Sequence, residues 1–114
     1  LSRLDIDLMA LELTNMRMLV EDSGDGAPSA ISSILKIRGS EIQQRTVELQ
    51  MEAVGSYSLP WQQGPLEPDW NGKPVGPAYA APRAPAFFDR RKTTIYGGST
   101  EVQKNIISKA ILGL

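Results

Sequence analysis

A diglycine turn that leads into a C-terminal helix is the part of this sequence best suited to chemistry. Gly97 and Gly98 interrupt the preceding segment, and Ser99 stands directly before residues 100–112, whose apolar positions recur at helical spacing. The first backbone N–H groups of a helix point outward, and the helix dipole favours a negative charge or a carbonyl oxygen there. The turn therefore predicts a ligand contact. A simple helix cap explains Ser99 as well, and the two roles are compatible.

Two further groups near this turn could take part in binding. Thr100 and Gln103 have the spacing of a reciprocal capping box. A compact basic cluster, Arg90-Arg91-Lys92, precedes the turn. This cluster is typical of a solvated helix face, but it also suits contact with a phosphate of a nucleotide-like ligand or a salt bridge between subunits.

Composition excludes several kinds of site. The 114 residues contain no Cys and no His, which rules out disulfides, Cys/His zinc sites, His general bases and Ser-His-Asp triads within this chain. Asp22 and Asp25 lie in a glycine-rich turn without the ligand spacing of a calcium loop, so we expect no metal site. The net charge of −1 predicts no general affinity for nucleic acid, and no apolar run approaches the roughly 20 residues that span a bilayer.

The elements that must position the turn are helical. Apolar periodicity predicts long helices over residues 1–21, 29–54 and 100–112, and a short one over 86–96. The short turn between the first two helices makes them antiparallel neighbours. We therefore predict an all-α antiparallel bundle of three long helices and one short helix, forming one domain over residues 1–114. The first helix carries Met9 and Met16 beside its main apolar stripe, and we interpret them as core-filling side chains.

A long proline-rich loop separates the two halves of the bundle. Seven of the eight prolines fall between Pro60 and Pro85, which precludes a continuous helix over residues 56–84. The aromatic side chains in this segment argue against full disorder, so we expect the loop to wrap over the helices. A proline-rich ligand for a recognition domain is the alternative. The aromatic residues are Tyr57, Trp61, Trp70 and Tyr79.

The stretch from Thr94 to Ile107 resembles the C-terminal signature of the acyl-CoA dehydrogenase family, in which Ile-Tyr-x-Gly-[Ser/Thr]-x-[Glu/Gln]-[Ile/Val]-Gln leads into the last helix. The stretch from Ile34 to Gln44 is also similar to bacterial members, particularly the group of pimeloyl-CoA dehydrogenase large subunits. The resemblance implies the C-terminal helical bundle of a longer, cytoplasmic bacterial flavoprotein of fatty acid metabolism. Because the sequence begins at Leu1 without Met, we interpret it as a fragment.

The resemblance also implies a chemistry. Family members bind FAD between the subunits of dimers or tetramers, and a carboxylate base removes the α-proton of an acyl-CoA thioester. A hydride leaves the β-carbon for the flavin, and electron-transfer flavoprotein receives the electrons. In many members the base is a Glu directly after the motif tyrosine, where this chain has Gly97. Others carry it on an earlier helix, so this chain contains no matched catalytic residue.

Two sets of residues correspond to the family's cofactor contacts. Ser99 and Glu101 match polar positions near the adenosine part of FAD. Glu52, Gly55 and Ser56 match a Gln-x-x-Gly-Gly element that reaches the FAD of the neighbouring subunit, but the Gln and the second Gly are replaced. A carboxylate near a pyrophosphate is repulsive, so we expect a cation to offset it, with Arg90 or Arg91 as the candidates.

The leading hypothesis is therefore an acyl-CoA dehydrogenase C-terminal domain that supplies subunit contacts and part of the FAD site and is inactive alone. The alternative is a non-catalytic, dehydrogenase-like assembly subunit that has lost its base, motivated by Gly97, Glu52 and Ser56. Acyl-CoA oxidases and flavin-dependent monooxygenases share the fold and are a third possibility. Because two or three helices leave apolar faces uncovered, we also expect the chain to self-associate.

Overall fold

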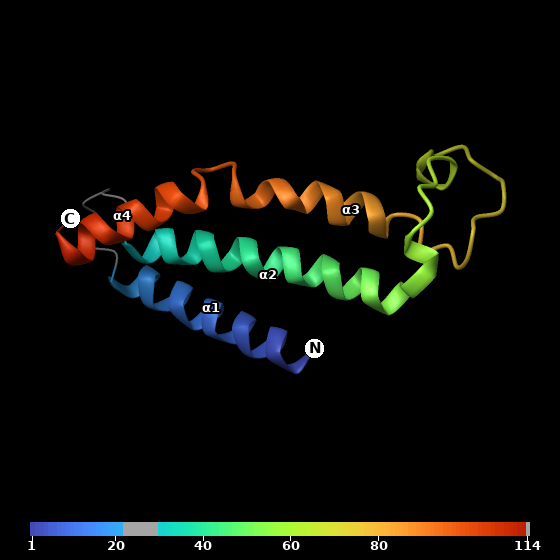
Figure 1. Cartoon of the computed structure of the whole chain (residues 1–114). Helices are drawn as coiled ribbons and strands as arrows, with labels where there is room; N and C mark the ends of the chain where they lie inside the picture. The colour runs from blue at the N-terminus through green and yellow to red at the C-terminus, as the bar shows by residue number, and fades with distance from the viewer. Residues whose placement is uncertain (22–29, 114) are drawn as a thin grey trace. The chain divides into compact units, whose positions relative to one another are not determined.

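The computed structural model describes residues 1–21 and 30–113, and within these ranges the regular structure is entirely helical (Figure 1). The α-helices are α1 (Ser2–Glu21), α2 (Ala30–Val54), α3 (Arg83–Arg90) and α4 (Thr100–Leu112). Short 3-10 helices are η1 (Gly55–Ser58), η2 (Gly64–Leu66) and η3 (Arg91–Thr94). This confirms the predicted class, with three long helices and one short one. The Asp22–Asp25 turn lies outside the described residues.

The chain forms two compact units. The first unit comprises Leu1–Gln43 and Lys92–Leu114, and the second comprises Gln44–Arg91. Helix α2 contributes residues to both, whereas α1 and α4 belong to the first unit and α3 to the second.

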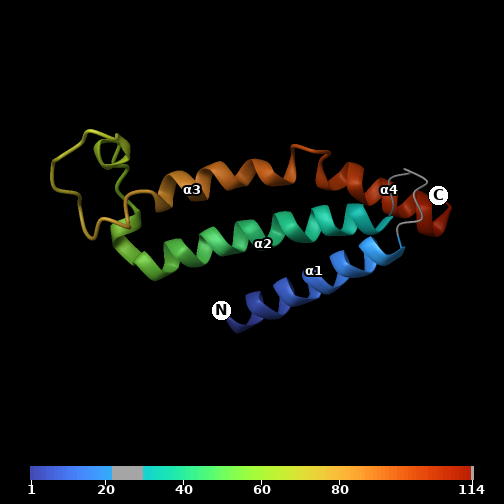
Figure 2. The ribbon, with the colours of Figure 1, turned by 180° about the vertical axis from the view of Figure 1, so that it is seen from behind.

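In the first unit, α1 runs antiparallel to the first part of α2, and α4 also lies alongside that part of α2 (Figures 1 and 2). Asp7 on α1 pairs with Arg38 on α2 at 3.0 Å. A Cβ atom placed on Gly39 would lie 4.0 Å from Leu11 Cδ2, which is ordinary van der Waals contact. The glycine therefore permits close packing of α1 without being indispensable to it.

The interpretation of Met9 and Met16 as core-filling side chains is wrong. Each is 61% exposed, on the side of α1 away from its half-buried positions, among which are Leu4, Leu11 and Met18. Helix α1 is apolar on two faces, and within the first unit α2 covers only one of them.

In the second unit, α3 runs antiparallel to the last part of α2 (Figure 2). The Gln44 side chain donates to the carbonyl oxygens of Arg90 and Arg91, both at 3.3 Å, which satisfies groups at the end of α3 that have no helical partner. At the other end of α3, Arg83 donates to Gln50 at 3.0 Å. The buried apolar side chains described are all in this unit: Val47, Ala80, Ala81 and Ala84.

Helix α3 begins three residues earlier than predicted and gives way to η3 after Arg90. The sequence reading placed its start after Pro85, but Pro85 lies within the first turn, where backbone N–H groups lack helical partners and proline is tolerated. Ala86 N–H already donates to the Pro82 carbonyl at 3.1 Å. The predicted end near Tyr96 merged α3 with the 3-10 turn that follows it.

The proline-rich loop packs its aromatic side chains against its own glycines. The Trp70 ring lies over Gly64 and Gly72, and the Tyr57 ring lies over Gly76, so a Cβ at any of these glycines would meet ring atoms at 2.5–2.6 Å. The Gln62 amide bridges the loop by donating to and accepting from the backbone of Val75 at 3.1 and 2.7 Å. The expectation that the loop wraps over the helices is wrong. Within the second unit the loop extends beyond the adjacent ends of α2 and α3 (Figure 1), and Trp61 and Tyr79 are each 63% exposed.

Candidate functional site

The diglycine turn in the first unit has the backbone that only glycine adopts easily. Gly97 and Gly98 have φ of +69° and +88°, in the left-handed region. Ser99 is the N-cap of α4, and its Oγ accepts from the Val102 N–H at 3.4 Å. Gln103 Nε2 donates to the Gly97 carbonyl at 3.0 Å and closes the turn. The capping box of Thr100 and Gln103 is therefore wrong, because the helix begins one residue earlier than that pairing requires.

Glu101 lies in the first turn of α4, beside the cap. A hydrogen bond from the Ser99 hydroxyl and then one from its own backbone N–H lower the pKa of the Glu101 carboxyl. The positive charges of Lys104 and Lys36 lower it further. Ser99 and Glu101 thus lie together and form an ionised acceptor at the helix start, while their contact with a cofactor stays a prediction. The buried Lys36 Nζ has no hydrogen-bond partner in the described part of the chain, and no motif in the sequence predicts this buried ammonium.

The Gly97 position is open. No atom lies within 4 Å of the place where a Cβ would stand, and the neighbouring Ile95 and Tyr96 side chains are exposed. Without a side chain, Gly97 neither donates nor accepts a proton at the position where many family members carry a glutamate base. The described residues leave the turn open at Gly97, but this glycine has no side chain that could take up a proton.

The second set of predicted contacts lies in the second unit, at the end of α2. Gly55 has φ of +63° and ends the helix, with no atom within 4 Å of its Cβ position, and Ser56 is exposed. The Glu52 carboxylate pairs with Arg45 Nη1 at 3.0 Å. The expectation that Arg90 or Arg91 offsets this carboxylate is therefore not met: its ion-pair partner is Arg45. The signal that reveals Arg45 is its position seven residues before Glu52, two helical turns along the same face.

Arg91 of the basic cluster is a half-buried residue that makes contacts within the second unit. Its Nη1 pairs with Glu48 at 3.2 Å, and its guanidinium lies 4.4 Å from the centroid of the Phe87 ring. Arg45 also pairs with Glu48 at 3.2 Å, as its i,i+3 spacing predicts. The hydrogen bond from Arg45, and after it that from Arg91, lowers the pKa of Glu48. Glu41, in the first unit, pairs with Arg38.

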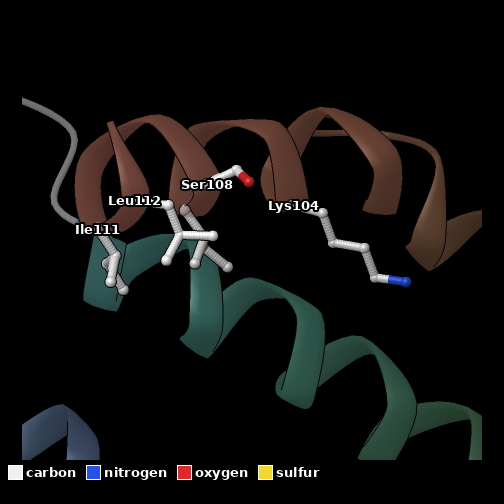
Figure 3. Close-up of a pocket in the computed structure, with 5 residues that line it drawn as sticks. Lys104, Ser108, Ile111 and Leu112 are labelled. Atoms are coloured by element: carbon white, nitrogen blue, oxygen red, sulfur yellow. The ribbon is translucent and has the colours of Figure 1, made fainter. Parts of the chain in front are cut away.

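Other features of the described residues offer less. An apolar hollow lies along α4 (Figure 3), but it gathers few polar groups and is unsuited to a flavin or a nucleotide. Its lining is Lys104, Ile107, Ser108, Ile111 and Leu112. Residues 1–21 and 30–113 contain no acidic cluster that could hold a metal ion. None of the described helices combines the length and apolarity needed to cross a membrane.

Comparison with known proteins supplies the family. A family model described as acyl-CoA dehydrogenase, C-terminal domain, matches residues 1–112. No curated protein and no solved structure matched the chain. The match covers almost the whole chain, including both the diglycine turn and the end of α2. The helical fold described above is consistent with a helical domain of this family. This chain belongs to the acyl-CoA dehydrogenase C-terminal domain family.

Proposed function

We propose that the chain is the part of an FAD-dependent acyl-CoA dehydrogenase that supplies subunit contacts and one wall of the flavin site. The observation that carries this proposal is the start of α4, where Ser99 caps the helix and holds the ionised Glu101 beside an open glycine turn. A carboxylate acceptor suits the hydroxyl groups of an adenosine. The family membership supplies the class of cofactor.

The residues of this chain fit a flavin at both candidate positions. At the start of α4, nothing obstructs the approach of a ligand to Gly97. At the end of α2, Arg45 compensates the charge of Glu52, which removes part of the repulsion expected between a carboxylate and a pyrophosphate. Gly55 is likewise unobstructed. FAD, when bound, supplies the hydride acceptor of the family's reaction, whereas these residues bind and orient.

The chain by itself lacks the base that removes the α-proton of the acyl-CoA. Gly97 stands where many members have their base, so proton removal from the acyl-CoA requires a carboxylate that this site does not contain. We propose that acyl-CoA and electron-transfer flavoprotein are partners of the full-length enzyme. The isolated chain binds but does not catalyse.

The experiment that tests this proposal combines binding and turnover on the purified 114-residue chain. Calorimetric titration with FAD is expected to give saturable binding. The same sample, given acyl-CoA and a dye acceptor, is expected to reduce no dye above the rate without protein. Absence of FAD binding would overturn the flavin part of the proposal, and acyl-CoA-dependent dye reduction would overturn the absence of a base.

A second candidate is a dehydrogenase-like assembly subunit without flavin. The glycine at position 97 favours it, as does the ion pair that holds Glu52 where the family has an amide. This candidate predicts that the chain associates with itself or with dehydrogenase subunits and shows no FAD binding in the same titration. The titration therefore separates the two.

A further inference from the structure

Arg45, in the second half of α2, uses only one of its guanidinium nitrogens. Its Nη1 pairs with Glu52 at 3.0 Å and with Glu48 at 3.2 Å. Among residues 1–21 and 30–113, no group accepts a hydrogen bond from its Nε or Nη2, and the side chain is 50% exposed. These two nitrogens form the edge of a guanidinium that binds a phosphate or a carboxylate through two parallel hydrogen bonds.

Arg38, in the first unit, has nearly the same exposure but a different hydrogen-bonding pattern. Its side chain is 49% exposed, and it also pairs with two carboxylates. Its Nη1 donates to Glu41, whereas its Nη2 donates to Asp7. Both ends of its guanidinium are therefore occupied. Arg45 holds both of its carboxylates with one nitrogen and so retains an edge with two free donors.

The neighbouring helix α3 helps to hold the Arg45 guanidinium in place. Glu48 is half-buried and pairs through Oε2 with Arg45 and through Oε1 with Arg91, both at 3.2 Å. Its carboxylate therefore links Arg45 to the end of α3 within the second unit. A guanidinium that is already held at one nitrogen loses less side-chain entropy when its free edge binds a ligand. The free edge of Arg45 is thus preorganised for binding.

A phosphate that approaches the end of α2 needs a positive charge there. The C-terminal end of a helix carries a partial negative charge, and the last turn of α2 contains no basic residue. Glu52 adds a full negative charge less than one turn before the helix ends. The pair with Glu52 brings the Arg45 guanidinium to this turn. Arg83 also contacts the second half of α2, but its Nη1 and Nε donate to Gln50 and to the Tyr79 carbonyl.

We propose that Arg45 binds a phosphate group of the ligand directly through its free Nε–Nη2 edge, while Nη1 keeps its two carboxylates. The ligand class is a nucleotide that contains a pyrophosphate, and its identification as FAD rests on the proposed function. Arg45 thereby does more than compensate the charge of Glu52, because it supplies two donors of its own. The contact is separate from Ser99 and Glu101 at the start of α4.

The first test is a double-mutant cycle that separates direct contact from charge compensation, with FAD binding measured by calorimetry. In the chain with Glu52, Arg45→Met is expected to raise the dissociation constant about thirtyfold, because the phosphate donors and the compensating charge are lost together. In the Glu52→Gln background that carboxylate is absent, and Arg45→Met is still expected to raise the constant about tenfold. No change in this background would show that Arg45 only neutralises Glu52 and would overturn the proposal.

The second test observes the contact in the unaltered chain, so it does not depend on the folding of any binding-site variant. Nuclear magnetic resonance resolves the Nε–H signals of arginine side chains, and Arg45→Lys assigns the Arg45 signal by its disappearance. This signal is expected to shift downfield when FAD is added, because a charged hydrogen bond forms at Nε. Inorganic pyrophosphate is expected to shift it in the same direction. The Arg38 signal is expected to stay in place with both ligands.

Two variants complete the design. Arg38→Met is expected to leave the FAD dissociation constant unchanged, and Arg45→Lys to recover only part of the affinity that Arg45→Met loses, since an ammonium lacks the two-donor edge. Full recovery with lysine would contradict the two-donor contact. FAD binding without a shift of the Arg45 signal would overturn the proposal and leave the flavin assignment standing. A shift with pyrophosphate but no binding of FAD would retain the phosphate site and overturn the flavin assignment, and no response to either ligand would overturn both.

Discussion

The two units of this chain achieve stability in different ways. The second unit, Gln44–Arg91, buries small apolar side chains and joins α2 to α3 through Gln44, Arg83 and Arg91. The first unit has buried hydroxyl side chains, such as Ser33 and Ser40, and none of its described apolar side chains is fully buried, although both units leave large apolar side chains exposed. The second unit therefore has a small apolar core between its own elements, whereas the described part of the first unit has none.

This difference agrees with the proposal that the first unit supplies contacts to a ligand and to other subunits. The diglycine turn and the exposed apolar face of α1, which includes Met9, Leu13 and Met16, both belong to the first unit. Contiguous exposed apolar faces mark interaction sites in soluble proteins. The second unit holds the second set of proposed contacts, Glu52, Gly55 and Ser56, and Arg45 pairs there with Glu52. The following variants test the contrast, from the largest expected effect to the smallest.

The largest effect is expected at Gly76 in the second unit. Gly76→Ala forces alanine into a φ of +79° and brings its Cβ to 2.5 Å from the Tyr57 ring, so we expect a loss of about 3 kcal/mol in the free energy of unfolding. Gly97→Ala in the first unit meets similar backbone strain with no contact, and we expect a loss of about 1 kcal/mol. Urea denaturation measures both. Equal losses would contradict the tighter packing of the loop.

The next largest effect is expected when a buried and an exposed apolar side chain are each replaced by alanine. Val47 is 8% exposed in the second unit, and Val47→Ala is expected to cost about 1.5 kcal/mol through lost burial and a residual cavity. Leu13 is 62% exposed, and Leu13→Ala is expected to change stability by less than about 0.5 kcal/mol at concentrations where the chain is monomeric. A large loss of stability for Leu13→Ala in the monomer would show that other residues of the same chain bury the Leu13 side chain.

The interactions of Arg91 provide a smaller contrast. Arg91→Met removes the ion pair with Glu48 and the contact of the guanidinium with Phe87, and we expect a loss of about 1 kcal/mol in urea denaturation. Arg38→Met in the first unit removes the pairs with Asp7 and Glu41. The Arg38 side chain is 49% exposed, against 38% for Arg91, so we expect a smaller loss of about 0.3 kcal/mol. The reverse order would contradict the assignment of Arg91 as a structural residue.

The smallest effect concerns acid stability. Hydrogen bonds from Arg45 and then Arg91 lower the pKa of Glu48 in the folded chain below its ordinary value of 4.5. A depressed carboxyl pKa contributes stability that is fully present above the unfolded value and is lost as the pH falls through the folded one. Glu48→Gln is therefore expected to lower stability near neutral pH and to flatten its decline below pH 4.5, as followed by thermal unfolding. An unchanged acid decline would show that Glu48 is not stabilised by these arginines.

Much of the fold could be predicted because helical periodicity is local. The bounds of α1, α2 and α4 follow from apolar spacing, Gly55 and Ser99, and the motif from Thr94 to Ile107 identified the family. The ion-pair partner of Glu52 was not predicted, although it is local. Glu52 pairs with Arg45 rather than with the distant Arg90 or Arg91, because a side chain two turns away on the same face is already in place.

Exposure was the other property that the sequence could not decide. Met9 and Met16 are apolar residues of the kind found in cores, yet they lie on the surface of the described chain. Apolar periodicity predicts that a helix face is buried, but it does not say which helix, or which chain, covers that face. The capping box failed for a related reason. Ser99 and Thr100 were both suitable N-caps, and only the backbone geometry placed the helix start after Ser99.

The central claim is that the start of α4 contacts FAD through Glu101. FAD titration of Glu101→Ala and of Lys109→Ala, a matched change at the other end of the same helix, tests it most directly. We expect the dissociation constant for FAD to rise about tenfold for Glu101→Ala, because a charged hydrogen-bond acceptor is lost, and to remain unchanged for Lys109→Ala. Equal affinities for the two variants and the unaltered chain would contradict the claim.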